Sequence, residues 1–230
     1  MFLEFARWKT SVVYTMKKYF IKDIICTIDK YLIPDIKISS GGDNGIYSNF
    51  ICIDNIVFAN GSNYFGQLGL GDNRVRDMYT KVDDLTNIKD ILCGGIYTFI
   101  IKNDNTVWCC GYNYHGQLGL GDNNDRNRFT KINVDNVKKI YHTNNCSFII
   151  KNDNTVWCCG DNYYGQLGLG DNNNRNRFTK VNVDNVKDII INKSHVFIIK
   201  IDGTVWASGC NVWGELELDD SENRNIFTQI

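Results

Sequence analysis

Short apolar runs separated by polar turns recur along this chain in a fixed order. In the best-preserved stretch, residues 146–151 hold a continuous apolar run, and the polar triplet at 152–154 separates it from a second run at 155–160. Asx residues tolerate the left-handed backbone of short hairpin turns, so this pattern predicts two antiparallel strands joined by a tight turn. Shorter runs at 137–141 and 177–181 predict one further strand on each side of the hairpin.

The same order of runs appears four times. The expected opening strands lie at 36–39, 88–92, 137–141 and 186–190, and the closing strands at 78–82, 128–132, 177–181 and 226–230. Four short antiparallel strands in a unit of about 50 residues are typical of a propeller blade. The sequence therefore predicts an all-β fold, a β-propeller of four-stranded antiparallel blades. Its four repeat units are expected at residues 36–86, 87–135, 136–184 and 185–230.

Each unit carries a glycine-rich loop between its third and fourth strands. The segment NYxGQLGLGDN occurs at 63–73, 113–123 and 162–172, and NVWGELELDD at 211–220 is a diverged fourth copy. Its glycines indicate a contorted backbone, and each leucine would gain about 1.5–3 kcal/mol on burial. We predict a rigid plug that turns its leucines into the core between blades. The residues expected to hold this frame are Gly66, Gly116, Gly165, Gly214, Leu68, Leu118, Leu167, Trp108, Trp157 and Trp206.

The composition of the chain disfavours several classes of function. The 230 residues carry a net charge of −1, which lacks the basic excess of a protein that binds nucleic acid. No apolar run reaches the roughly 18 residues of a membrane span. The three histidines fall at different places in their units and no catalytic motif is present, so we predict no enzyme, no metal site and no cofactor. Nine cysteines without a CxxC pair indicate buried, reduced thiols in an intracellular protein, cytoplasmic or nuclear.

Two sets of loop residues are candidates for binding a protein partner. The residue before the first loop glycine stays large but changes identity from copy to copy, and arginines precede each closing strand. Variable large side chains on loops are typical contact residues. The alternatives are that each ring covers the adjoining loop, and that the arginines form local ion pairs with Asp72, Asp122, Asp171 and Asp219. The candidates are Phe65, His115, Tyr164, Trp213, Arg74, Arg126 and Arg175.

Residues 1–35 do not match the repeat. Large apolar residues recur there at a spacing of three or four, which predicts an amphipathic helix. A cap over an exposed blade edge and a docking helix for another protein are the two roles we consider. The residues that carry this pattern are Phe5, Trp8, Val12, Met16, Phe20 and Ile24.

The units resemble the regulator of chromosome condensation repeat over residues 36–230. The resemblance rests on the Gly-Gln-Leu-Gly-x-Gly-Asp element, present three times, and on residues 194–216, SHVFIIKIDGTVWASGCNVWGEL. The family histidine is kept only at His195, where we align Tyr47, Tyr97 and Cys146 in the other units, and the last loop has Glu215, Glu217 and Asp219 in place of Gln, Gly and Gly. The resemblance implies a β-propeller that typically has seven blades.

Four such units leave the closure of the ring open. Blades shaped for a seven-membered ring turn by roughly 51° each, so four of them span somewhat over half a circle. An open arc, a homodimer of paired arcs, a ring closed by flattened blades and the product of a truncated gene all fit the sequence.

A protein–protein interaction scaffold is the function that we expect. The resemblance also implies guanine-nucleotide exchange on a Ran-type small GTPase, although no residue here can be matched to the loops that act on the GTPase. Association with chromatin, a further property of the resembled family, is disfavoured by the near-neutral charge.

Overall fold

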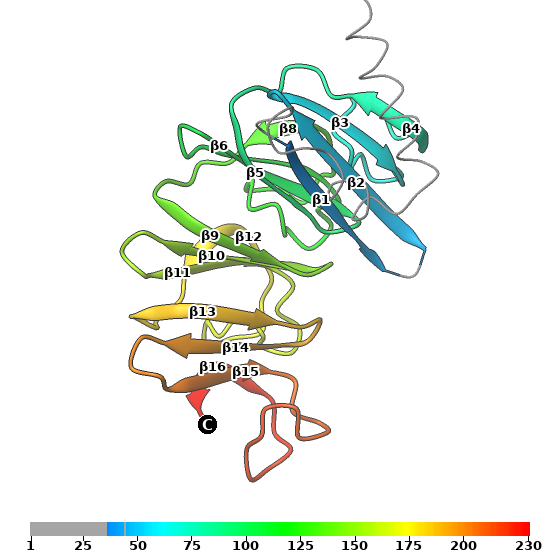
Figure 1. The fold of residues 1–230 in the computed structure, drawn as a ribbon. Coiled ribbons are helices and arrows are strands. Elements are labelled where there is room, and N and C mark those ends of the chain that lie inside the picture. The colour runs from blue at the N-terminus through cyan, green and yellow to red at the C-terminus, as the bar shows by residue number, and fades with distance from the viewer. Residues whose placement is uncertain (1–35, 44) are drawn as a thin grey trace, which may run out of the picture.

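The computed structural model describes residues 36–43 and 45–230, and the helix expected within residues 1–35 lies outside them. The described residues form sixteen strands (Figure 1). They are β1 (Ile36–Asp43), β2 (Ile46–Ile53), β3 (Ile56–Gly61), β4 (Arg76–Lys81), β5 (Ile88–Cys93), β6 (Tyr97–Lys102), β7 (Val107–Gly111), β8 (Arg126–Lys131), β9 (Val137–His142), β10 (Cys146–Lys151), β11 (Val156–Gly160), β12 (Arg175–Lys180), β13 (Val186–Ile191), β14 (His195–Lys200), β15 (Val205–Gly209) and β16 (Arg224–Gln229).

The strands form four sheets, each with four antiparallel strands in chain order, which we call blades 1 to 4. This confirms the prediction of an all-β fold built of four-stranded blades. The blades follow one another along the chain, and blades 1 and 4 lie at opposite ends of the array (Figure 1). Within residues 36–43 and 45–230, no helix has the length and apolar character needed to cross a membrane.

The hairpins between the second and third strands form where the sequence predicts them. Asp54 and Asn55 make a two-residue turn with φ of 49° and 62°, the left-handed pair that matches the twist of the flanking strands. The equivalent turns use Asn105, Asn154 and Gly203, at φ of 61°, 62° and 88°. A residue type that tolerates positive φ therefore marks each of these turns.

The strand register corrects one alignment made from the sequence. Tyr97 pairs with Gly111 at the start of β6, and Ser48 pairs with Gly61 at the corresponding place in β2. The residue equivalent to His195 in blade 1 is therefore Ser48, and the assignment of Tyr47 was wrong. A slip of one residue moves a side chain to the other face of the sheet, so Ser48 is buried and Tyr47 exposed.

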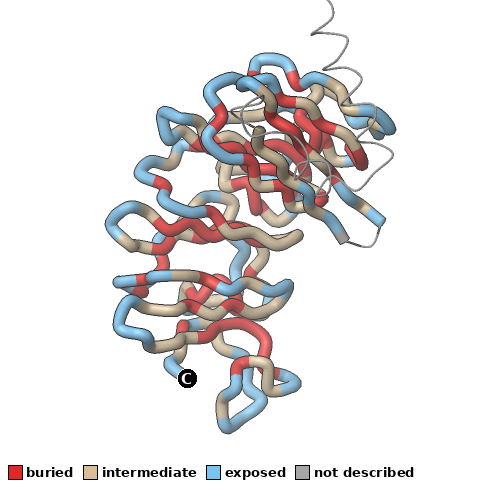
Figure 2. Tube along the Cα trace, viewed as in Figure 1, coloured by how far each residue is buried: buried red, intermediate tan, exposed pale blue. Residues whose placement is uncertain are grey.

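The core lies between neighbouring blades. The second strands β6 and β10 are buried on both faces over five successive residues, which explains their continuous apolar runs. Leu68, Leu118 and Leu167 are each 0 % exposed, as the plug interpretation predicts. Figure 2 shows the buried segments in the middle of the blades and the exposed ones at the turns.

The glycine-rich loops of blades 1 to 3 each dock on the fourth strand of the following blade. The Gly71 nitrogen donates to the Asn127 carbonyl oxygen at 2.7 Å, and the same bond recurs from Gly121 to Asn176 and from Gly170 to Asn225. Beside these bonds, Leu70 forms an isolated antiparallel bridge with Arg128. The loop therefore holds consecutive blades together through these contacts.

Candidate functional site

The loop backbone is held by two asparagines in each full copy. In blade 2, the Asn113 side chain accepts from the Leu118 nitrogen at 2.9 Å and donates to the Asp122 carbonyl at 2.9 Å. The Asn123 amide donates to the Tyr114 carbonyl at 2.8 Å. Asn113 is 0 % exposed, so these bonds satisfy a buried polar group that would otherwise cost free energy. The loop therefore presents its side chains from a fixed backbone.

An exposed tyrosine projects from each of the three full loops. Tyr64, Tyr114 and Tyr163 are 63 %, 67 % and 72 % exposed. In each loop the tyrosine follows the asparagine that opens a tight turn, in which the glycine nitrogen donates to the asparagine carbonyl three residues back. All three rings are therefore open to solvent. We call these three residues the tyrosine set.

The tyrosine set was missed by sequence reasoning, which favoured the variable residue that follows each tyrosine. Among those candidates, Phe65, His115 and Tyr164 are half-buried, and only Trp213 is fully open, at 88 % exposed. The asparagine-tyrosine step at the start of each turn is a signal that could have identified the tyrosines. Their identity in all three copies made them look like part of the frame.

Two of the half-buried candidates, Phe65 and His115, contact the next unit. The Phe65 ring lies 4.7 Å from the Tyr112 ring between centroids, and the His115 Nδ1 lies 3.9 Å from an Asp161 oxygen. Asn174 also approaches the His115 ring, at 3.4 Å. Units 2 and 3 are nearly identical in sequence, yet positions 112/161, 115/164 and 125/174 differ. Residues that differ between the copies therefore meet at the contacts between blades.

The candidate arginines form ion pairs within their own loops. The Arg126 guanidinium lies 2.6 Å from the Asp122 carboxylate, and Arg175 lies 2.7 Å from Asp171. In blade 1 the equivalent residue is Arg76, at 2.7 Å from Asp72, so Arg74 lies outside this set. In blade 4, Arg224 pairs with Asp220 at 2.5 Å, which corrects the expectation that Asp219 would be the partner.

These ion pairs predict a loss of stability in acid. The hydrogen bond from Arg126 lowers the pKa of Asp122, and arginines do the same for Asp72, Asp171 and Asp220. As the pH falls, these aspartates therefore bind protons in the unfolded state before they do so in the folded state. Their contribution to the free energy of unfolding is present above the unfolded pKa of about 3.9 and is lost as the pH falls through the lower pKa values of the folded state. We expect the urea concentration at the midpoint of unfolding to decrease as the pH is lowered below about 4. The variant Asp122→Asn should show a less steep decrease.

The matched control for this prediction is Asp184→Asn, at an exposed aspartate without an ion pair among residues 36–43 and 45–230. It should leave the pH profile of the wild type unchanged. An Asp122→Asn profile as steep as that of the wild type would contradict the assignment.

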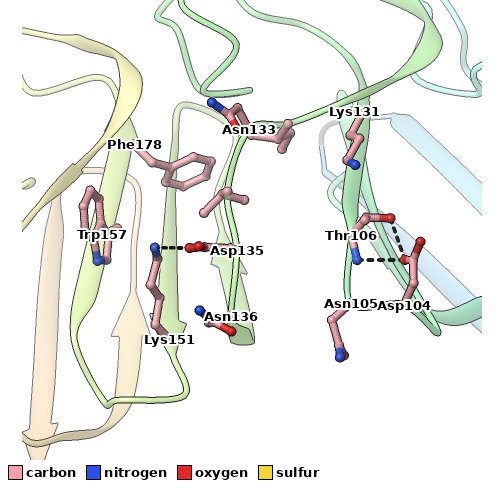
Figure 3. Close-up of a pocket in the computed structure, with 12 residues that line it drawn as sticks. Asp104, Asn105, Thr106, Lys131, Asn133, Asp135, Asn136, Lys151, Trp157 and Phe178 are labelled. Atoms are coloured by element: carbon pink, nitrogen blue, oxygen red, sulfur yellow. Dashed lines mark hydrogen bonds and ion pairs between the residues drawn. The ribbon is translucent and has the colours of Figure 1, made fainter.

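Grooves that are lined in part by lysine side chains lie between adjacent blades. The groove between blades 2 and 3 has a volume of 550 Å³, and that between blades 3 and 4 has 470 Å³. In the first, Lys151 lies 4.5 Å from the centroid of the Trp157 ring and 2.7 Å from an Asp135 oxygen (Figure 3). The tryptophan nitrogen in turn donates to Thr155. These polar groups already have partners within the protein, so we assign the groove a packing role.

Burial alters the acid–base properties of cysteine thiols and of His142. Seven cysteines from Cys93 to Cys210 are free and buried, as expected; Cys52 is also buried, and Cys26 lies outside the described residues. Burial raises the pKa of Cys146 to about 12 and lowers the pKa of His142 to about 4. Among the described residues, no group of three or more His, Cys, Asp or Glu could hold a metal ion.

Four tandem antiparallel blades joined by glycine-rich connectors define a repeat protein of the β-propeller class. The family profile described as Regulator of chromosome condensation (RCC1) repeat matches residues 104–142 and 153–198, and a second profile with the same description matches 88–117. Residues 88–142 and 153–198 therefore match this repeat family. A comparison with curated proteins gives no match.

Solved structures show the same fold. Yeast RCC1 (Prp20), in a crystal structure with Kap60, aligns with a TM-score of 0.72 and 20 % identity, over 85 % of this chain and 48 % of that one. Prp20p from Saccharomyces cerevisiae, a structure described together with its binding to Gsp1p and histones, gives 0.71 and 21 %, over 85 % and 50 %. Human WBSCR16 gives 0.68 and 20 %, over 80 % and 49 %. The chain spans about half the length of each of these structures.

Proposed function

We propose that this protein is an interaction scaffold that binds a protein partner through its glycine-rich loops. The observation that carries the proposal is the tyrosine set, three exposed rings at equivalent places in successive blades. Each tyrosine carbonyl is fixed by a loop asparagine, at 2.8 Å for Tyr64 and Tyr114 and 2.9 Å for Tyr163. Rigid exposed aromatic side chains lose little conformational entropy on binding and are frequent hot spots in protein interfaces.

The residues beside the tyrosine set extend this surface. The Tyr114 ring packs edge-on against His115 and stacks on Tyr112, and Phe65 reaches the same group through Tyr112. In blade 3, Tyr163 packs edge-on against Tyr164. We infer that the variable residues support the exposed tyrosines and tune their surroundings. The arginines at 74, 126 and 175 border the same loops, and Trp213 lies on the corresponding loop of blade 4.

The test is affinity purification from the host with a triple variant, Tyr64→Ala, Tyr114→Ala and Tyr163→Ala. Each exposed hot spot that is lost should cost about 2 kcal/mol, so a specific partner should disappear from the triple variant. The matched control replaces three exposed apolar side chains outside the loops: Ile56→Ala, Met78→Ala and Ile201→Ala. The proposal fails if both triple variants retain the same partners as the wild type.

Nucleotide exchange on a Ran-type small GTPase is the second candidate. It is supported by the family and by the fold shared with Prp20p, whose structure is described with its binding to Gsp1p. Acceleration of nucleotide release from a Ran-type GTPase by the purified protein would favour it, and release at the background rate would remove it. Chromatin association has less support, because the net charge is −1 and the loop arginines are paired with aspartates. The free, buried thiols from Cys93 to Cys210 suit a reducing compartment, the cytoplasm or the nucleus.

A further inference from the structure

The face of blade 4 that points away from blade 3 repeats the apolar positions that are buried in the other blades. In blade 3, Phe148, Ile150 and Val156 are at most 1 % exposed because blade 4 covers them. The strand register places Phe197, Ile199 and Val205 at the same positions of blade 4. These three side chains are only half-buried, and Ile230 beside Val205 is 41 % exposed. We call this surface, together with the loop at 211–223, the blade 4 end face.

The loop of blade 4 differs from the others where a following blade would dock. A Cβ at Gly119 would lie 2.5 Å from the Phe178 ring of the next blade, and Gly69 and Gly168 face Phe129 and Phe227 in the same way. Glu217 holds this position in blade 4, at φ of 56°. If a blade of the same design followed, its phenylalanine would clash with the Cβ of Glu217. If blade 1 of a second copy packed here, Tyr79 would take the place of that phenylalanine. Neither fits this face in the way that the blades fit one another.

An acidic side chain also replaces the third glycine of the blade 4 loop, and acidic side chains border the apolar surface. At the contacts between blades 1 and 2 and between blades 2 and 3, Gly71 and Gly121 face the guanidinium groups of Arg128 and Arg177, whereas Gly170 faces Ile226 at the third contact. Asp219 takes this position in blade 4, beside Glu217 and Glu222. Glu217 and Asp219 are exposed, and neither carboxylate has a hydrogen bond or ion pair among residues 36–43 and 45–230. The position that meets a cation in two of the other three loops therefore carries an anion here.

We propose that the blade 4 end face binds a cationic amphipathic segment of a partner protein. The apolar side of the segment covers Phe197, Ile199 and Val205, and its basic side chains meet Glu217 and Asp219. Trp213, which is 88 % exposed on the same loop, is the aromatic anchor at the rim. Complementary charge selects the partner and the apolar contact supplies the affinity. This surface is separate from the tyrosine set, so the two proposals can fail independently.

The test uses two fluorescein-labelled synthetic peptides of about 18 residues, with leucines on one helical face and either lysine or glutamate on the other. In fluorescence anisotropy with the full chain, the lysine peptide should bind saturably, and the glutamate peptide at least about tenfold more weakly. The double variant Glu217→Lys, Asp219→Lys should reverse that preference. The control variant Asp77→Lys, Asp184→Lys makes the same charge change on other blades and should keep it. Circular dichroism confirms that each variant is folded.

Three results would overturn the proposal: equal affinity for the two peptides, a preference that survives in the double variant at positions 217 and 219, or no binding of either peptide. Light scattering adds a further outcome. A stable dimer that dissociates in the same double variant would assign the face to a second copy and reject the cationic segment. The triple tyrosine variant should bind the lysine peptide as the wild type does, which separates this site from the loop surface.

Discussion

Replacement of Gly119 by glutamate is expected to lower the free energy of unfolding by at least about 3 kcal/mol. The new Cβ would lie 2.5 Å from the Phe178 ring, and the backbone φ of 69° disfavours any side chain. Overpacking of this kind costs about 1–3 kcal/mol, and a left-handed residue adds about 1–2 kcal/mol. Because blades are stabilised mainly by their neighbours, we also expect a broader transition in urea, as the two halves of the array uncouple.

The matched control is the reverse change at the equivalent position, Glu217→Gly. No following blade contacts this position, and glycine relieves the left-handed strain, so we expect a gain of about 1 kcal/mol. Urea denaturation followed by circular dichroism measures both variants. If Gly119→Glu were as stable as the wild type, the docking of the loop on β12 would be wrong, together with the argument that Glu217 excludes a regular blade.

Replacement of Leu118 by alanine is expected to cost about 3 kcal/mol. Leu118 is 0 % exposed and belongs to the core between blades 2 and 3, with Phe99, Val137 and Ile149. Removing a buried leucine side chain costs its transfer free energy and leaves a cavity, about 2–5 kcal/mol together. The fixed loop backbone prevents a collapse that would fill the cavity, because the Asn113 side chain holds the Leu118 nitrogen at 2.9 Å.

Leu120→Ala in the same loop is the control for this prediction. Leu120 is only partly buried at the edge of the same core, so its loss should be clearly smaller in the same urea titration. Equal losses for the two variants would contradict the plug role of the first leucine in each loop.

The blade could be predicted from the sequence because its signals are local. Apolar runs, Asx or glycine turns and the glycine-rich segment lie within about 50 residues of one another, and each forms mainly through contacts inside its own unit. The limits of local reasoning appear at Ser48 and Asp220. A shift of one residue in the alignment gave Tyr47 and Asp219 instead, because only the pairing of strands and the ion pair with Arg224 fix the register.

The candidate site was predicted only in part. The sequence identified the loops that carry it, but favoured Phe65, His115 and Tyr164 over the more exposed tyrosines beside them. Whether a loop side chain is open depends on the neighbouring blade, as when Tyr112 covers Phe65 at 4.7 Å between ring centroids. Trp213, the fourth of these candidates, is 88 % exposed.

The sequence by itself determined that four units of one design follow each other, each a small antiparallel sheet with a glycine-bent connector. It could do so because the alternation of apolar and polar residues and the turn chemistry act within a unit. The tertiary structure decided which side chains the connectors expose, how the arginines pair and which face of blade 4 remains uncovered. These properties depend on contacts between units, and nearly identical repeats carry little sequence information about where they meet.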